Sequence, residues 1–128
     1  MRMGFVAGEL ILEVGYGSDC DDVLRSEIAA MTGTELIEGQ TTEVVDAVIL
    51  WWRDGDGDLV DELMDALTYL TETGPIWVLT PKLGRDGHVE SSDIQDAAPI
   101  AGLSQTSTIA LAQDWAGTRL VARKVGKR

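Results

Sequence analysis

The sequence predicts an α/β fold with an open, mostly parallel sheet of about six strands and helices on both faces. Three observations support this fold class. Short apolar runs alternate with segments of helical periodicity, and turn residues separate them. The apolar run 44–52 is rich in β-branched and aromatic residues, which is typical of a strand covered on both faces. Two further apolar runs close the chain with only a turn between them, which predicts a C-terminal antiparallel hairpin.

The expected order of elements is strand, helix, strand, strand, helix, strand, helix, strand, strand. Strands alternating with helices favour parallel pairing, since the chain must cross over the sheet between neighbouring strands. The hairpin turn is expected at 114–117. The six strands are expected at residues 10–14, 35–39, 44–52, 76–80, 105–111 and 118–123.

The first helix is expected over residues 21–31, because apolar residues recur there at helical spacing. Asp19 or Asp21 can cap its start, and Gly33 closes it. Its buried face is expected to consist of Val23, Leu24, Ile28 and Met31.

The second helix begins after the N-cap Asp58 and ends at Gly74-Pro75. The third begins at Ser91 or Ser92 and runs toward Gly102, with Pro99 kinking or interrupting it. The second helix is expected to bury four leucines: Leu59, Leu63, Leu67 and Leu70.

The 128 residues suit one domain, expected over 1–123, followed by a basic flexible tail at 124–128. No apolar run is long enough for a membrane span or a signal peptide, so we expect a cytoplasmic protein. The single cysteine, Cys20, fits a reducing compartment. Its aspartate neighbours Asp19, Asp21 and Asp22 are expected to raise its pKa.

Acidic residues outnumber basic residues by 22 to 10, which gives a formal charge of −12. A surface this negative disfavours unaided binding to nucleic acid and to anionic lipid. Basic partners and cations remain open, and so does the simpler interpretation that the charge keeps the protein soluble.

Glycines follow the first expected strand and precede the first helix. In open α/β sheets, ligands bind beyond the carboxyl ends of the strands. Gly15 and Gly17 would let the backbone approach a nucleotide-type cofactor closely. Glu38 lies near the end of the second strand, about 20 positions further on, where an acidic residue can hold a ribose hydroxyl. Gly15, Gly17 and Glu38 are therefore the candidate cofactor-binding residues.

The segment Leu12-Glu13-Val14-Gly15-Tyr16-Gly17 resembles the cofactor loop of class I S-adenosylmethionine-dependent methyltransferases, and the whole strand order is similar to theirs. This resemblance implies a Rossmann-like domain with S-adenosylmethionine above the first glycine loop. The chain departs from that pattern at Asp19, where the family has a third glycine. Only about 30 residues separate the first loop from the strand at 44–52, so one strand-helix pair is missing. The loop after Trp52 lacks the Asn/Asp-Pro-Pro-aromatic motif of amino-methylating members. The resemblance thus implies a truncated methyltransferase-like fold.

Three longer segments resemble a family of small acidic actinobacterial proteins known mainly as a domain of unknown function. This resemblance covers almost the whole chain. It implies a bacterial cytoplasmic protein and names no reaction. The segments are 51–59, 79–89 and 114–121.

Other candidate residues have ordinary structural interpretations beside their functional ones. Alternate aspartates at 54, 56 and 58 could hold a hard cation, but a loop that caps a helix explains them equally, and no complete metal-ligand set is present. His88 could be a general base or a structural histidine. Lys82 and Arg85 could bind an anion or pair with those aspartates. Trp51 and Trp52 should point to opposite faces of the sheet.

Two functions remain in view. The first is a non-catalytic binding or regulatory module that acts through the loops after Trp52 and Thr80 and through the acidic surface. The alternative is an enzyme that binds S-adenosylmethionine or a nucleotide and whose substrate site is completed by a partner. No catalytic residue is assigned. We expect a protein partner or self-association, with an oligomeric scaffold as a third possibility, and a small-molecule ligand remains open.

Overall fold

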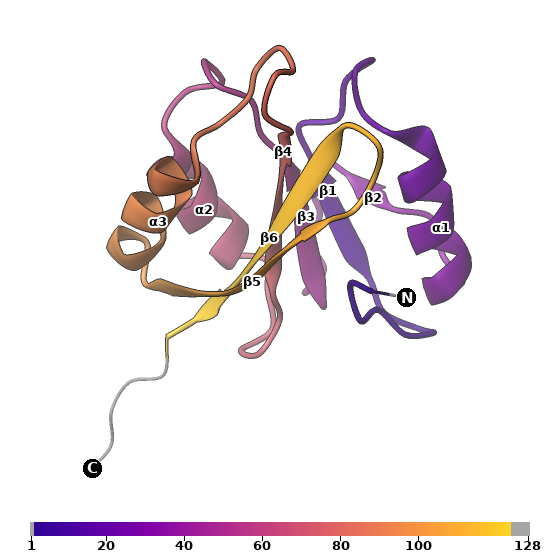
Figure 1. Cartoon of the computed structure of the whole chain (residues 1–128). Coiled ribbons are helices and arrows are strands. Elements are labelled where there is room, and N and C mark those ends of the chain that lie inside the picture. Colours follow the sequence, from indigo (N-terminus) through magenta and orange to yellow (C-terminus); the bar gives the residue numbers. More distant parts are fainter. Residues whose placement is uncertain (1, 124–128) are drawn as a thin grey trace.

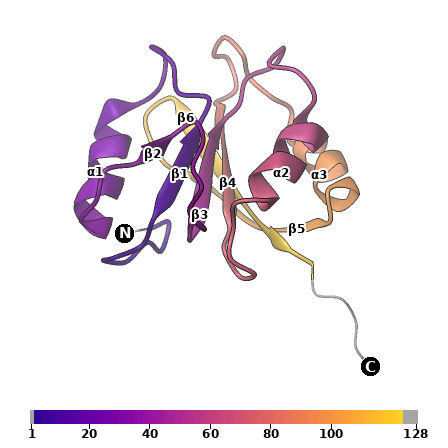
Figure 2. The ribbon, with the colours of Figure 1, turned by 180° about the vertical axis from the view of Figure 1, so that it is seen from behind.

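The computed structural model describes residues 2–123, and the basic tail expected at 124–128 lies outside these residues. A sheet forms the centre of the molecule, with α1 on one side and α2 and α3 on the other (Figures 1 and 2). The predicted order of elements is confirmed. The elements are β1 (Ile11–Val14), α1 (Asp22–Thr32), β2 (Ile37–Glu38), β3 (Ala47–Trp51), α2 (Leu59–Leu67), β4 (Ile76–Pro81), α3 (Ser91–Ile100), β5 (Leu103–Ala110) and β6 (Trp115–Ala122).

Within the described residues the sheet has six strands in the order β2-β1-β3-β4-β6-β5. The pairs β1–β2, β1–β3 and β3–β4 are parallel, whereas β4–β6 and β5–β6 are antiparallel. The predicted fold class, a mostly parallel sheet with a C-terminal antiparallel hairpin, is thus confirmed. From β1 the chain crosses outward to β2, while β3 leads the other way to β4, so the strand order reverses between β1 and β3.

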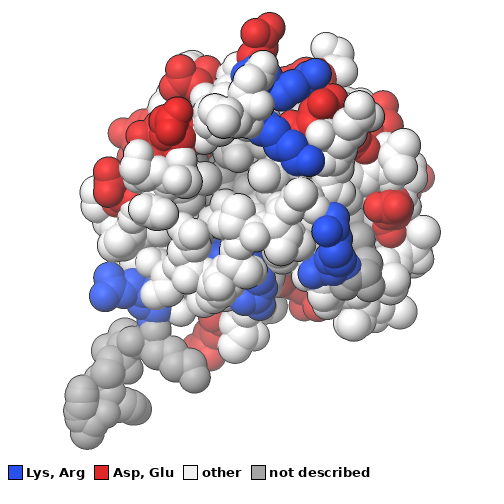
Figure 3. Space-filling model, viewed as in Figure 1, with Lys and Arg blue, Asp and Glu red and all other residues white. Residues whose placement is uncertain are grey.

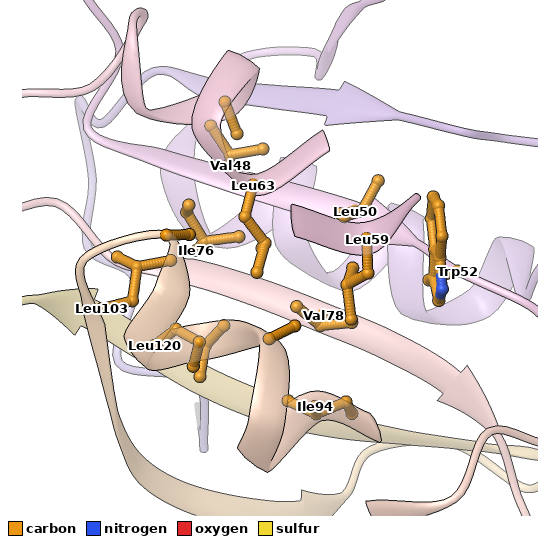
Figure 4. Packing of buried hydrophobic residues seen from close by; sticks show 14 of the residues in the cluster. Val48, Leu50, Trp52, Leu59, Leu63, Ile76, Val78, Ile94, Leu103 and Leu120 are labelled. Atoms are coloured by element: carbon orange, nitrogen blue, oxygen red, sulfur yellow. The ribbon is translucent and has the colours of Figure 1, made fainter. Parts of the chain in front are cut away.

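The sheet separates two hydrophobic clusters. Leu59 and Leu63 of α2 and Ile94 of α3 pack on one face (Figure 4), whereas Leu24 and Ile28 of α1 pack on the other. Strand β3 serves both clusters, because neighbouring side chains of a strand point to opposite faces. The predicted opposition of Trp51 and Trp52 is therefore confirmed, and both side chains are buried.

The first helix buries a narrower face than the sequence predicts. Leu24 and Ile28 are buried, but Val23 is 71% exposed and Met31 is 39% exposed. The prediction was wrong for these two residues, because only one side of α1 meets the sheet. Asp21 is the N-cap and accepts from the Leu24 N–H at 2.8 Å, and Gly33 closes the helix in the left-handed conformation as predicted.

The ends of the other helices also differ from the prediction. Helix α2 ends at Leu67 rather than at Gly74-Pro75, because the chain turns there and places Leu70 beside Val45 in a parallel bridge. Helix α3 starts after Glu90, and neither Ser91 nor Ser92 is its N-cap. The helix continues through Pro99, which lies in its last turn. Pro99 has no N–H to donate to the carbonyl four residues earlier, and the helix ends one residue after it.

The hairpin has the predicted pairing but different bounds. Strand β5 begins two residues earlier than expected, at Leu103, and β6 already includes Trp115, so the turn lies at 111–114, three residues earlier than predicted. No helix among residues 2–123 is long and apolar enough to cross a membrane.

Leu63 is the centre of the cluster beneath α2, with no exposed surface. Leu63→Ala should therefore lower the free energy of unfolding by about 3 kcal/mol through lost burial and a residual cavity. Met64 is the matched control, because it is 52% exposed on the same helix. Met64→Ala should change the free energy of unfolding by less than about 0.5 kcal/mol in urea titrations followed by circular dichroism. Equal losses in the two variants would contradict this placement of α2.

Candidate functional site

The candidate site lies where the strand order reverses, at the carboxyl ends of β1 and β3. The loop after β1 and the loop after β3 meet there. The tip of the β5–β6 hairpin closes one side, because Trp115 Nε1 donates to the Asp19 carbonyl at 3.1 Å. Three chain segments that are distant in sequence therefore form this crevice.

A buried carboxylate, Glu13, lies at the base of the crevice. Glu13 belongs to β1 and is only 1% exposed. It accepts a bidentate pair of hydrogen bonds from Arg25 of α1, at 2.7 and 2.8 Å. It also accepts from Trp51 Nε1 of β3 at 2.8 Å. A buried charge is costly unless it is paired and hydrogen-bonded, and Glu13 satisfies both conditions.

Arg25 connects this carboxylate to the candidate ribose-binding residue. Its Nη2 donates to Glu38 at 3.1 Å, and its guanidinium lies 4.0 Å above the ring of Tyr16. Hydrogen bonding to Glu13 raises the pKa of Arg25 above its ordinary range, so the side chain stays charged. The carboxylate of Glu38 is thus already engaged by a cation of the same chain, although the side chain is largely exposed.

Arg53, the second residue after β3, fills the crevice itself. Its guanidinium donates to the backbone oxygens of Gly15 at 2.8 Å and of Trp51 at 3.2 Å. It also donates to both carboxylate oxygens of Asp19, at 2.9 and 2.6 Å. Its Nη2 lies 3.1 Å from the Cys20 sulfur. A cation of the chain therefore occupies the place between two strand ends where open α/β sheets bind ligands.

Aromatic packing holds Arg53 from the other side. The guanidinium lies 5.4 Å from the ring centroid of Trp115, within the range of a cation–π contact. Trp115 meets Trp51 edge to face, with ring centroids 4.8 Å apart. Arg53 is consequently fixed by hydrogen bonds on one side and by the hairpin on the other.

The two candidate glycines are explained by contacts within the chain. Gly15 has φ of 84°, and a Cβ there would lie 2.5 Å from the Trp51 carbonyl oxygen. Gly15 therefore lets the first loop pass close to the end of β3. A Cβ on Gly17 would meet Asp19 and Arg53 side-chain atoms at 3.2 and 3.3 Å. The structure thus brings Gly15 and Gly17 together around Arg53, and their role in cofactor binding stays a prediction.

Arg53 and burial change two titrating groups of the first loop. Hydrogen bonds from Arg53 hold the pKa of Asp19 below its ordinary value of 3.8. Burial raises the pKa of the Cys20 thiol above 9.0, and this effect exceeds the opposing influence of the Gly17 N–H and of Arg53. The sequence attributes that rise to neighbouring aspartates, whereas burial is the larger cause. Cys20 is therefore a poor nucleophile at neutral pH.

The remaining candidate residues serve structural contacts. Arg85 pairs with Asp114 at 3.3 Å, while Asp56 pairs with Arg53, so the predicted pairing of Arg85 with the loop aspartates was wrong. Asp114 lies in the turn between β5 and β6, and sequence spacing did not relate it to Arg85. His88 Nδ1 lies 2.9 Å from the Pro81 carbonyl. Asp58 accepts from the Asp61 N–H at 3.2 Å and caps α2 as predicted.

Five well-formed hollows on the described surface have volumes between 340 and 630 Å³. None of these five is lined by Gly15, Gly17 or Glu38. The hollow beside the crevice measures about 370 Å³ and is lined by Asp19, Arg85, Asp114 and Trp115 among others. Among residues 2–123, no three or more His, Cys, Asp or Glu side chains are placed to share a metal ion.

Sequence reasoning missed Glu13, Arg25, Arg53 and Trp115 as residues of the site. One signal was present for Glu13, since it is a charged residue inside an otherwise apolar strand. Arg53 also follows directly on a buried strand, at the edge where sites are expected. The other two depend on contacts between distant segments and carried no local signal.

The fold and the crevice define a truncated methyltransferase-like α/β domain. Residues 1–124 match the family described as protein of unknown function DUF3052, and the chain belongs to that family. An uncharacterized protein of Mycobacterium tuberculosis is 50% identical over 129 residues, covering 99% of this chain and 81% of the relative. The resemblance to an actinobacterial family is therefore confirmed.

Solved methyltransferases share the fold. An O-methyltransferase from neocarzinostatin biosynthesis, in complex with S-adenosylmethionine, superposes with a TM-score of 0.67 at 13% identity, over 91% of this chain and 49% of that chain. A ribosomal protein methylase from Lactobacillus delbrueckii subsp. bulgaricus superposes with a TM-score of 0.61 at 15% identity, over 96% and 74%. Identities this low show a common fold alone.

Glu13→Gln should destabilise the protein strongly, because it removes a buried charge and leaves Arg25 without its main partner. We expect a loss of about 3 kcal/mol in the free energy of unfolding. Glu38→Gln is the matched control, since it removes an exposed carboxylate from the same arginine and should cost less than about 1 kcal/mol. Urea titrations of both variants measure this difference. A small loss in Glu13→Gln would show that the buried pair is dispensable.

Arg53→Gln should lower the free energy of unfolding by about 2 kcal/mol near neutral pH, through lost charged hydrogen bonds. The pKa of Asp19 is depressed in the folded protein, so the ion pair stabilises above pH 3.8 and loses its effect as the pH falls through the lowered value. The difference between wild type and Arg53→Gln should therefore shrink below pH 3.8. Arg85→Gln, at an exposed pair, serves as the control and should show little difference at any pH. A difference that is constant with pH would contradict the assignment to Asp19.

Proposed function

We propose that this protein is a non-catalytic binding or regulatory module with a degenerate methyltransferase-like fold, acting in the bacterial cytoplasm. One observation carries the proposal. The guanidinium of Arg53 occupies the crevice between β1 and β3 and is hydrogen-bonded to Gly15, Trp51 and Asp19. A ligand bound above the first glycine loop would have to displace it.

Displacing Arg53 would be expensive. Losing the hydrogen bonds of Arg53 should cost about 2 kcal/mol in total, because the Asp19 carboxylate that accepts two of them is largely exposed. Its departure would also leave the carbonyls of Gly15 and Trp51 without this donor. The interactions of a cofactor would have to offset all of these losses before any net affinity appeared.

Glu38 and the two glycines, the groups expected to hold S-adenosylmethionine, are also engaged within the chain. Glu38 is paired with Arg25, and the two glycines face groups of the same chain rather than open space. Within residues 2–123, no buried polar side-chain atom of the first loop lacks a hydrogen-bond partner. These contacts support a loop that completes the fold instead of one prepared for a cofactor.

The alternative function is an enzyme that binds S-adenosylmethionine or a nucleotide and receives its substrate site from a partner. The likeness in fold to an O-methyltransferase in complex with S-adenosylmethionine favours it. This chain covers 49% of that enzyme, so a partner would have to supply the rest. The alternative requires Arg53 to swing away from Asp19 when the cofactor binds.

Titration calorimetry with S-adenosylmethionine and with S-adenosylhomocysteine separates the two functions. We expect no saturable heat up to about 1 mM ligand, because Arg53 fills the crevice. Micromolar affinity that is lost in Glu38→Ala and kept in Glu43→Ala would overturn the proposal and establish the alternative. Glu43 is a suitable control because it is exposed in the same connection between β2 and β3.

A further inference from the structure

Strand β5 forms an open edge of the sheet. It pairs with β6 on one side and is the last strand in the sheet order. Its residues Ser104 to Thr108 are exposed one after another. Because successive side chains point to opposite faces, five consecutive exposed residues mean that both faces of the strand are uncovered as well as its edge. Alternate backbone N–H and C=O groups of β5 therefore face outward.

The edge lacks most of the features that protect other edge strands. Proteins usually block exposed edges with charged residues, proline or bulges. Strand β5 reads Leu-Ser-Gln-Thr-Ser-Thr-Ile-Ala, with no charge and no proline, and carries one register shift between Gln105 and Ser107. Only the carbonyl of Ala110, at its far end, accepts a side-chain hydrogen bond, from Arg2.

Charge is divided unevenly between this edge and the rest of the chain. Among the described residues that follow Ala97, two are basic, Arg119 and Arg123, and one is acidic, Asp114. Seen from the side of the hairpin, Lys and Arg atoms lie across the lower centre, near the top and at the lower left edge of this face, and Asp and Glu atoms lie mainly around its outline (Figure 3). Arg119 of β6 donates to Thr106 of β5, and Arg123 follows β6 directly. The edge is thus a basic region on an acidic protein.

Hollows lie on both faces of the strand. On one face, a hollow of about 340 Å³ is lined by Gln105 and Thr108 of β5. On the other, a hollow of about 450 Å³ is lined by Ser107, Ile109 and Arg119, and Trp77 also lines it. Trp77 is 1% exposed, and its Nε1 has no hydrogen-bond partner among the described residues. Alternate side chains of a further strand would point toward these two hollows.

Acidic side chains near these hollows are already engaged. Glu9 accepts from the Val6 N–H at 2.9 Å, and Asp46 accepts from the Leu10 N–H at 2.8 Å. Glu90 lies 3.7 Å from His88 Nε2. Arg119 contacts Thr106 of β5, and Arg123 lines a hollow together with Leu103 to Thr106, so both cations lie against the edge itself.

We infer that β5 is a docking edge for an acidic, extended segment of a partner protein, which adds to the sheet as a seventh strand. Backbone hydrogen bonds to β5 supply affinity, the two hollows take alternate apolar side chains, and carboxylates meet Arg119 and Arg123. This inference deepens the proposed function by naming the partner's chemistry.

Two other occupants fit the edge less well. A second copy would bring the arginines of two equivalent edges together, so that like charges would face each other. Proteins that bind single-stranded nucleic acid stack its bases on exposed aromatic rings, whereas all four tryptophans of this chain are buried. An acidic peptide segment is the occupant whose charge and backbone match the edge.

The test is selection from a displayed random library of peptides about twelve residues long against the full-length protein. Selected peptides should be rich in Asp and Glu with apolar residues at alternate positions. Their affinity should fall at least about tenfold in the Arg119→Glu/Arg123→Glu variant. The control Arg85→Glu reverses one charge on the β4–α3 loop, outside both hollows, and should alter affinity less than about twofold, whereas Arg119→Glu alone makes the same charge change at the edge and should lower affinity more. Far-UV circular dichroism of these variants confirms that they are folded.

Methylation of the peptide backbone then tests strand addition. N-methyl groups on the amides of one peptide edge should abolish binding, and those on the opposite edge should leave it unchanged, since only one edge pairs with β5. Equal effects of the two methylation patterns, or selected peptides without acidic enrichment, would overturn the inference. A dimer detected by light scattering that dissociates in the Thr106→Pro variant would also overturn it. So would a single-stranded oligonucleotide that binds more tightly than the selected peptides and loses its binding in Arg119→Glu/Arg123→Glu. The calorimetric titration with S-adenosylmethionine tests the crevice alone, whereas the peptide experiments test β5 alone. The proposed function and the docking edge can therefore fail separately.

Discussion

The carboxylate of Glu13 joins the elements that surround the crevice. It receives Arg25 from α1 and the indole N–H of Trp51 from β3, and Arg25 extends the contact to Glu38 beside it on β2. Trp51 in turn packs on Trp115 of the hairpin. The Glu13 carboxylate accepts hydrogen bonds from the Arg25 guanidinium and from an indole N–H. Moving any of these donors away would leave a buried charge without a hydrogen bond in an apolar environment, so the surrounding elements are held in place. The position of the hairpin over the crevice follows from this constraint.

The same network determines what the crevice can do. Trp115, held by Trp51, donates to the carbonyl of Asp19, and the Asp19 carboxylate holds Arg53. In a fold whose strand ends usually bind a ligand, those ends are here joined to one another by protein hydrogen bonds. A sheet that lacks one strand-helix pair has fewer elements to enclose a nucleoside. Arg53 hydrogen-bonds to the loops after β1 and β3 and thereby keeps both loops ordered at the strand ends. Stability and ligand binding would thus compete for the same polar groups.

The sequence predicted the order of elements and the faces of β3, because both depend on local periodicity and on the alternation of side chains. It failed where a tertiary contact decides the outcome. Leu70 lies beyond the end of α2, beside Val45, and Val23 faces solvent because only one side of α1 meets the sheet. The loops at the strand ends, where the sequence predicts a site, do meet in the structure, but the contacts that join them were not predicted. Arg53 and Asp19 are 34 residues apart, and no spacing rule relates them.

The composition of β5 suits an edge that must stay soluble and yet available. Long apolar edges aggregate, and charged edges repel most strands. Hydroxyl and amide side chains avoid both outcomes, since they keep the edge hydrated without adding charge of their own. The neighbouring arginines then exclude basic strands and attract acidic ones, which is selection by charge at a backbone interface. Because these features lie at the end of the sheet opposite β2, binding at β5 needs no movement of Arg53. The filled crevice and the open edge are therefore compatible parts of one molecule, in which the part of the fold that normally binds a ligand serves stability and a different strand remains free for recognition.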